Sequence, residues 1–393
     1  MGLEKFEVLG IFYMNYAKRK RKFKLICMKT KVAVVKKKEN KFELKQVVLD
    51  APKAHEVLVK IVATGLCHTD VSVRDGVLPT NFPVVLGHEG AGIVEEVGSH
   101  VNDLKKGDHV VLSYGSCGHC RPCEEGTTAY CLQLEPLNFM NKRQASNDAI
   151  YTSEGEKLHG AFFQQSSFGT YAIAHERNTV KVDKEVDLKL LGPLGCGIQT
   201  GAGTVMNTFN PNPGTSIAIF GVGSVGLSAV IAAENAGCAQ IIAVDVNPER
   251  LELSLKLGAT HIINSKKVDP IEKIKGICAE GVDFAVEASG IKAVAEQAFK
   301  TLANRGTLAV VGAPVGGTEY SFDANDMINH GKRVRGVVEG DSIVKVYIPR
   351  LIELYKQGRF PFDKLVTYYK FEDINSAIED MEAGKVIKPI LEM

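Results

Sequence analysis

The fold of this chain is decided by the stretch Ser216-Ile217-Ala218-Ile219-Phe220-Gly221-Val222-Gly223-Ser224-Val225-Gly226. Its mostly apolar first half predicts a buried strand, and the G-x-G-x-x-G spacing that follows opens a helical pattern. In that context the glycines let a pyrophosphate approach the N-terminus of the helix. Asp245 ends the next predicted strand, where a carboxylate binds ribose hydroxyls.

Gly221, Gly223, Gly226 and Asp245 therefore predict a dinucleotide site. Because the acid at position 245 repels a 2′-phosphate, the site is expected to prefer NAD over NADP. A glycine turn that serves only helix–strand packing is the alternative.

The pattern of predicted elements changes near residue 198. Residues 30–197 contain short β patterns between Gly, Asp and Pro, whereas strands and helices alternate from 198 to 338. Such alternation predicts a parallel, doubly wound sheet. The tail after residue 339 is too small to fold alone, so we expect it to return to the first domain. The sequence thus predicts an α/β protein with a mostly-β domain over 28–197 and 339–393 and a dinucleotide-binding domain over 198–338.

Four cysteines crowd into Cys117-Gly118-His119-Cys120-Arg121-Pro122-Cys123 and the nearby Cys131. Thiolates spaced by two, two and seven residues can close a tetrahedral shell around Zn²⁺. Since that shell leaves no open coordination position, we expect a structural zinc that orders the lobe 113–135. An iron–sulfur cluster uses a similar spacing and is the main alternative.

A second group of metal-binding side chains comes from Cys67-His68-Thr69-Asp70 and from Gly87-His88-Glu89. The first stretch follows a predicted strand, and both lie beside glycine turns. A thiolate and an imidazole presented from two loops are ligands that Zn²⁺ favours. Cys196, in Leu194-Gly195-Cys196-Gly197, is the best candidate for a third ligand. The alternative is that these side chains are buried without binding a metal.

The bulk composition narrows the class of protein. The 393 residues are 45% hydrophobic and 24% charged, as in an ordinary two-domain globular chain. The net charge of +1 gives no reason to expect a nucleic-acid or membrane partner, and no secretory signal is recognisable. Because the cysteines are crowded locally in a large apolar chain, we expect metal ligation in a reducing, cytoplasmic location. The basic residues 1–27 are interpreted as a disordered extension upstream of a natural start at Met28.

Together these motifs resemble the zinc-dependent medium-chain alcohol dehydrogenases over residues 28–393. Gly87-His88-Glu89-Gly90-Ala91-Gly92-Ile93-Val94 is similar to the zinc-site signature of that family, and the cysteine lobe and glycine motif follow in the expected order. The resemblance implies a GroES-like catalytic domain, a Rossmann coenzyme domain, NAD, two zinc ions per chain and a homodimer or homotetramer. Gly192–Gly201 and the region of Phe168 look most similar to the aryl-alcohol (benzyl-alcohol) dehydrogenases.

The resemblance also assigns roles at the zinc site. Cys67, His88 and Cys196 match the catalytic zinc ligands. Asp70 resembles the carboxylate that orients the ligand histidine, and Thr69 the residue that holds the alcohol hydroxyl and begins the proton path.

Other residues match positions around that site. Glu89 resembles an acid that can approach zinc when ligands exchange, with a buried ion-pair partner as the alternative. His68 and Lys388 resemble cofactor-phosphate contacts, and an exposed surface lysine is the alternative for Lys388. Ser72 departs from the family, because many members place a proton-passing histidine there.

The substrate prediction rests on three further positions. Phe162 and Phe163 fall where the family commonly lines its substrate cleft, and the small Ser113 would widen it. These residues suit an aromatic or allylic alcohol, although core packing also explains the two phenylalanines. The expected function is reversible, zinc- and NAD-dependent oxidation of a primary alcohol to the aldehyde. A zinc dehydrogenase for a glutathione adduct or a polyol is the alternative enzyme, and a non-catalytic nucleotide-binding protein is the alternative from another class.

Overall fold

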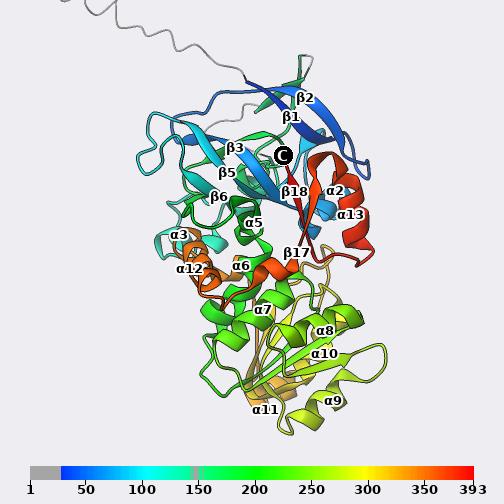
Figure 1. Ribbon diagram of the computed structural model, residues 1–393. Helices are drawn as coiled ribbons and strands as arrows, with labels where there is room; N and C mark the ends of the chain where they lie inside the picture. The colour runs from blue at the N-terminus through cyan, green and yellow to red at the C-terminus, as the bar shows by residue number, and fades with distance from the viewer. Residues whose placement is uncertain (1–27, 142, 145–149, 154) are drawn as a thin grey trace, which may run out of the picture.

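The computed structural model describes residues 28–141, 143–144, 150–153 and 155–393. The extension predicted over residues 1–27 lies outside the described residues. Three β-sheets organise the described chain, two in the upper half of Figure 1 and one in the lower half.

The first sheet of the upper half has the strand order β4-β1-β2-β7-β8. Its strands are β1 (Met28–Val35), β2 (Glu43–Leu49), β4 (Val84–Val85), β7 (Tyr151–Ser153) and β8 (Glu156–Leu158).

The second sheet has the order β10-β6-β5-β3-β18-β17, and β9 also pairs with β3. Its strands are β3 (Glu56–Gly65), β5 (Glu89–Val97), β6 (His109–Leu112), β9 (Tyr171–His175), β10 (Thr179–Lys181), β17 (Val366–Lys370) and β18 (Lys388–Glu392). The C-terminal strand β18 runs antiparallel to β3, with Ile390 opposite Gly65. In Figure 1 the red tail therefore returns to the blue N-terminal domain.

The third sheet confirms the predicted parallel, doubly wound architecture. Its order is β13-β12-β11-β14-β15-β16, and all of its strand pairs are parallel. The strands are β11 (Ser216–Phe220), β12 (Gln240–Asp245), β13 (His261–Asn264), β14 (Val282–Glu287), β15 (Leu302–Val310) and β16 (Arg333–Gly336). The helices associated with this sheet are α7 (Ser224–Asn235), α8 (Pro248–Lys256), α9 (Pro270–Ile277), α10 (Lys292–Lys300) and α11 (Ala324–His330).

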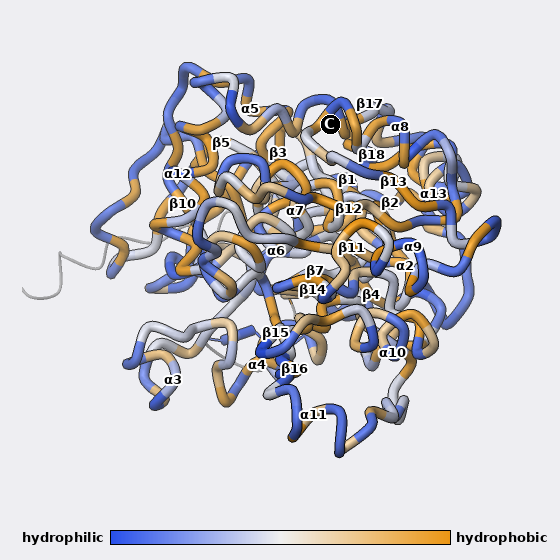
Figure 2. Tube along the Cα trace, turned by 90° about the horizontal axis from the view of Figure 1, so that it is seen from below, coloured by the Kyte–Doolittle hydropathy of each residue, from blue (hydrophilic) through white to orange (hydrophobic). Residues whose placement is uncertain are grey.

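Local sequence explains these elements. Ile217, Ala218 and Ile219 of β11 are fully buried, as expected of a central parallel strand covered on both faces. Helix α8 begins at Pro248 because the side chain of Asn247 accepts hydrogen bonds from two backbone N–H groups of the first turn. Figure 2 shows apolar residues on inner strands such as β11 and β12.

The remaining helices lie around the β-sheets of the upper half or between the halves (Figure 1). They are α2 (His68–Arg74), α3 (Arg121–Glu124), α4 (Leu134–Asn138), α5 (Leu188–Leu191), α6 (Gly197–Gly203), α12 (Val344–Lys356) and α13 (Ile374–Glu382). Within the described ranges, every helix is too short or too polar to cross a membrane.

Candidate active site

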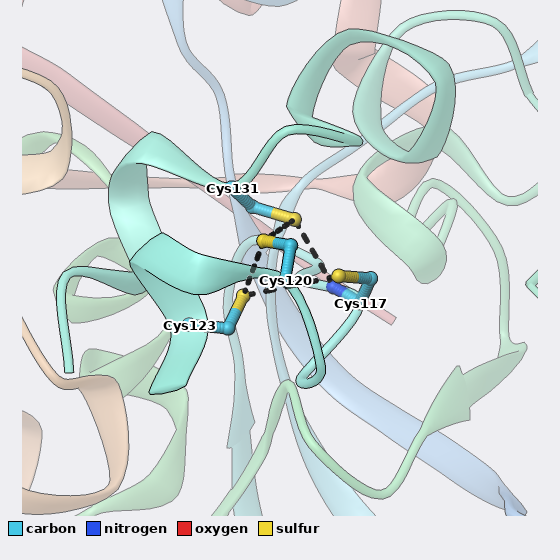
Figure 3. Close-up of side chains that lie close together, drawn as sticks. All are labelled: Cys117, Cys120, Cys123 and Cys131. Atoms are coloured by element: carbon cyan, nitrogen blue, oxygen red, sulfur yellow. Dashed lines mark hydrogen bonds between the residues drawn. The ribbon is translucent and has the colours of Figure 1, made fainter. Parts of the chain in front are cut away.

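Four cysteine side chains converge in the lobe that contains α3, as Figure 3 shows. The sulfurs of Cys117, Cys120, Cys123 and Cys131 all lie within 4.8 Å of one another. The Cys120–Cys123 and Cys120–Cys131 pairs are 3.5 and 3.8 Å apart. Four tetrahedral Zn–S bonds of about 2.3 Å would separate the sulfurs by about 3.8 Å. The spacing thus fits one zinc ion, whereas a multi-iron cluster would need room for several metal atoms between the thiolates.

Backbone N–H groups donate to two of these sulfurs. Cys117 N–H donates to Cys131 Sγ at 3.2 Å, and Leu132 N–H donates to Cys120 Sγ at 3.5 Å. The bond from Leu132 is the largest cause that lowers the pKa of Cys120, to about 6. Since the thiolate is the form that binds metal, Cys120 favours the charge state that zinc requires. Burial raises the pKa of Cys123 and raises that of Cys131 to about 12, so a bound cation would be needed to hold these two sulfurs as thiolates.

A second candidate metal centre forms where the last residue of β3 lies beside the first residue of β5. Gly65 on β3 is paired with Glu89 on β5, so the loops that carry Cys67 and His88 meet at one edge of the sheet. Cys196 arrives as the residue before α6. One ligand atom from each of Cys67, His88, Glu89 and Cys196 lies within 4.8 Å of the others. The structure therefore brings together the three predicted zinc ligands and the predicted nearby acid.

The environment of the His88 imidazole fits a metal ligand. Its ring is fully buried, and its Nε2 has no hydrogen-bond partner among the described residues. A buried nitrogen without a partner is costly unless an ion occupies that position. The hydrogen bond between Cys67 and Cys196 is the largest cause that lowers the pKa of Cys67 well below its usual value and raises that of Cys196, so a bound cation would be needed to hold both as thiolates. The donor set fits a zinc ion held by two thiolates and one imidazole.

Asp70 fastens the two ligand loops to each other. Its Oδ1 lies 3.0 Å from His88 Nδ1 and accepts from the backbone N–H of Gly87 at 3.0 Å. Its Oδ2 accepts from the backbone N–H of Cys67 at 3.1 Å. A carboxylate on the far nitrogen of a ligand histidine fixes the tautomer and the ring orientation. The geometry agrees with the orienting role that the sequence predicted for Asp70.

Glu89 and Lys388 form a buried ion pair beside this centre. The Lys388 ammonium lies 2.8 and 3.1 Å from the two carboxylate oxygens of Glu89 and donates to Leu66 O at 3.2 Å. Although burial alone would lower the pKa of Lys388, the charge of Glu89 raises it above the usual value. The Lys388 side chain is 2% exposed, so the alternative of an exposed surface lysine is wrong. Its contact with a cofactor phosphate stays a prediction.

Aromatic rings cover the ligand histidine. The ring centroids of Phe162 and Phe163 lie 5.5 and 4.5 Å from that of His88. Phe139, which the sequence analysis missed, packs on both rings at 6.2 and 5.3 Å. Phe139, Phe162 and Phe163 therefore form an apolar wall that touches the candidate metal centre. No local sequence pattern indicated Phe139.

The glycine motif forms an open turn between β11 and α7. Gly226 permits close packing, because an added Cβ would lie 2.0 Å from Gly221 O. An added Cβ at Gly223 would meet no atom within 4 Å among the described residues, so this side of the turn is open to an approaching phosphate. The Asp245 carboxylate accepts from Val222 N–H at 2.7 Å and from Asn247 N–H at 2.8 Å, which places the acid at the turn. These features fit a dinucleotide.

Other predicted residues have clear positions but untested roles. Thr69 lies beside the first ligand, with its hydroxyl 3.7 Å from Cys67 Sγ, and His68 is exposed. Ser113 is buried, and its hydroxyl donates to Gly195 O at 2.6 Å. A position for Ser113 in the substrate pocket stays a prediction.

Glu339 was also missed by sequence reasoning. It is 8% exposed and follows β16, yet its carboxylate reaches α6 next to Cys196. Burial raises the pKa of Glu339 to about 7.

A metal centre at the edge of a β domain, joined to a parallel sheet with an open glycine turn, defines a two-domain zinc dehydrogenase. Comparison with known families agrees. Residues 53–184 match the model of the alcohol dehydrogenase GroES-like domain, and residues 224–357 match that of the zinc-binding dehydrogenases.

Individual relatives match nearly the whole chain. The geraniol dehydrogenase of Castellaniella defragrans is 41% identical over 91% of this chain and 96% of its own length. The crystal structure of an alcohol dehydrogenase zinc-binding domain protein from Burkholderia ambifaria has a TM-score of 0.91 and 51% identity, and covers 93% of this chain and 99% of its own. The benzyl alcohol dehydrogenase structure from Acinetobacter calcoaceticus has a TM-score of 0.89 and 48% identity, with the same coverage.

The chain belongs to the zinc-dependent alcohol dehydrogenase family. It is an oxidoreductase that acts on CH–OH groups, as the sequence predicted, and the GroES-like and Rossmann-type domains are confirmed with it.

Proposed function

We propose that this enzyme oxidises primary aromatic or allylic alcohols to aldehydes with NAD, reversibly. The observation that carries this proposal is the aromatic wall of Phe139, Phe162 and Phe163 on the ligand histidine. Flat, unsaturated substituents pack well against such rings. The names of two relatives, a benzyl alcohol and a geraniol dehydrogenase, support the same substrate class.

Cys67, His88 and Cys196 would hold the catalytic zinc, and the open turn at Gly223 with Asp245 would hold NAD. When bound, zinc supplies Lewis-acid activation of the alcohol hydroxyl, and NAD accepts the hydride from the carbinol carbon. Asp70 holds a proton of the ligand histidine on Nδ1 and fixes the orientation of the ring, so that Nε2 is the nitrogen that would bind the metal. The phenylalanine rings would exclude water from the space beside this histidine.

Thr69 is the residue that we expect to move the proton. Its hydroxyl lies beside Cys67, so it can accept a hydrogen bond from the alcohol and pass the proton outward. Ser72 stands one turn further along α2. Because a serine hydroxyl does not titrate near neutrality, we infer that Ser72 does not take up the proton, and that Thr69 passes it outward toward water.

The coenzyme preference follows from Asp245. Its carboxylate lies at the glycine turn, where it would bind the adenosine ribose and repel a 2′-phosphate, so we infer NAD as the coenzyme. We also infer a cytoplasmic homo-oligomer with one catalytic and one structural zinc in each chain.

The test is a panel of benzyl, cinnamyl, geranyl, ethyl and polyol alcohols, each assayed for NADH formation with and without a zinc chelator. Chelator-sensitive turnover that is fastest on benzyl, cinnamyl or geranyl alcohol is expected. Turnover fastest on polyols, or only with a glutathione adduct, would refute the substrate class. Absence of turnover with every alcohol, from protein that holds two zinc ions per chain, would refute the proposed function, whereas a non-catalytic nucleotide-binding protein is expected to hold one zinc ion or none.

A further inference from the structure

A buried hydrogen-bond network connects the end of the coenzyme sheet to the zinc ligand Cys196. Glu339 follows β16 in a short 3₁₀ turn over Glu339–Asp341. Its Oε2 accepts from Gln199 Nε2 at 3.0 Å and from Thr200 Oγ1 at 3.4 Å. Both donors lie in the first turns of α6, which starts directly after Cys196.

Gln199 extends the network into the β domain. Its Nε2 also lies 2.8 Å from Gly195 O and 2.9 Å from Ser113 Oγ, and its Oε1 accepts from Ser342 Oγ at 3.0 Å. The Thr200 hydroxyl also lies 2.8 Å from Cys196 O, so its single proton is shared between that carbonyl and Glu339. The segment that carries Cys196 is therefore hydrogen-bonded on one side to the β domain and on the other to Glu339, in the turn that follows β16.

The backbone at Glu339 is held in an unfavourable conformation. Glu339 and Asp341 have φ angles of 50° and 51° on either side of Gly340. A non-glycine residue in the left-handed region costs about 1–3 kcal/mol and persists only when its surroundings enforce it. Here α6 enforces it, because an added Cβ on Gly340 would lie 2.4 Å from Gln199 O. Asp341 anchors the turn separately, through Thr208 at 2.8 Å and Arg335 at 2.6 Å.

The carboxylate of Glu339 lacks the partner that usually accompanies a buried acid. Among the described residues its hydrogen-bond partners are an amide, a hydroxyl and the Cys196 thiol, none of which is a cation. Burying a carboxylate that has only neutral hydrogen-bond donors costs stability. Such a residue therefore points to a role other than stabilising the fold. If this residue only packed the two domains together, an apolar side chain would do so equally well.

We propose that Glu339 is a positioning residue, which fixes the first turn of α6 through Gln199 and Thr200 and so holds Cys196 at zinc-binding distance. The inference rests on the catalytic zinc centre that the proposed function requires, and it is independent of which alcohol is oxidised. It also explains why the network spans both domains, because the ligand loop lies at their junction.

The test measures zinc binding instead of turnover. Purified holoenzyme is challenged with a colorimetric chelator, and release of the two zinc ions is followed for wild type, Glu339→Leu and Glu339→Gln. Loss of a group that orients a metal ligand typically lowers metal affinity by about 10–100-fold. Glu339→Leu is expected to lower the affinity of one zinc per chain by about that factor and to leave the four-cysteine zinc unchanged. Glu339→Gln is expected to stay within about threefold of wild type, because its amide oxygen still accepts both hydrogen bonds.

The matched control is Glu280→Gln, at an exposed glutamate before β14. Unchanged affinity in Glu339→Leu, or an equal loss of both zinc ions, would overturn the proposal. If Glu339→Leu does not fold, Gln199→Met removes the opposite side of the same hydrogen bond and must show the same selective loss. Since no alcohol or coenzyme is present, failure of the alcohol assay would leave this result intact.

Discussion

Asp70 offers the sharpest test of how the catalytic centre is built. It accepts three hydrogen bonds, from Cys67 N–H at 3.1 Å, from Gly87 N–H at 3.0 Å and from His88 Nδ1 at 3.0 Å, and it is fully buried. Asn at this position keeps one acceptor oxygen and turns an NH₂ group toward at least one of these donors. A buried donor left without a partner costs about 1–3 kcal/mol.

Asp70→Asn is therefore expected to lower the affinity of the catalytic zinc by about 10–100-fold, or about 1.4–2.7 kcal/mol. The assay is competition with a chelator of known zinc affinity, with metal content measured on the separated protein. The four-cysteine zinc should stay bound, which provides an internal reference. Asp103→Asn, at an exposed acid, is the matched control. If Asp70→Asn retained the catalytic zinc as tightly as wild type, the three hydrogen bonds would not support the ligands.

Three other substitutions test separate parts of the molecule. Cys123→Ser removes one of the four convergent thiolates, so metal analysis should fall from two zinc ions per chain to one; two retained ions would contradict a single-ion shell. Asp245→Ser removes the acid at the glycine turn, so the KM for NAD should rise by about 10–100-fold relative to that for NADP, and an unchanged ratio would refute its role. His175 is buried and its Nδ1 accepts from Arg177 N–H at 3.2 Å, and burial lowers its pKa from 6.5 to about 4. Between pH 6.5 and 4 the unfolded chain binds a proton that the folded chain does not, so stability should fall as the pH falls, by up to about 3 kcal/mol. Urea unfolding should lose this part of the pH dependence in His175→Gln, and an unchanged pH dependence would show that another group is responsible.

The features that the sequence predicted well depend on short stretches of chain. The four cysteines of the lobe lie within fifteen positions, and the glycine motif with its flanking strand and helix lies within about thirty. Spacing alone therefore constrains their geometry. Cys196 lies much further from Cys67 and His88, and its prediction rested on a glycine-flanked cysteine of the right ligand type.

Contacts that depend on the folded arrangement of distant segments were beyond the sequence. Lys388 meets Glu89 across 299 positions because β18 pairs with β3, so the ammonium turns inward onto the carboxylate. Gln199 meets Glu339 across 140 positions, and Glu339 belongs to no motif that the sequence analysis used. Charged residues are usually exposed, so a sequence alone predicts that they lie on the surface. Only the fold shows that these charges are buried beside the metal centre.

The central claim is that hydride leaves the alcohol at the centre formed by Cys67, His88 and Cys196. The most direct measurement incubates the holoenzyme with NAD and benzyl alcohol in which both hydrogens of the carbinol carbon are deuterium, and analyses the reduced coenzyme by mass spectrometry. The account predicts one deuterium in each reduced nicotinamide from wild type, and none from Cys67→Ser protein that retains only the structural zinc. Deuterated coenzyme formed at the wild-type rate by that variant would contradict the account.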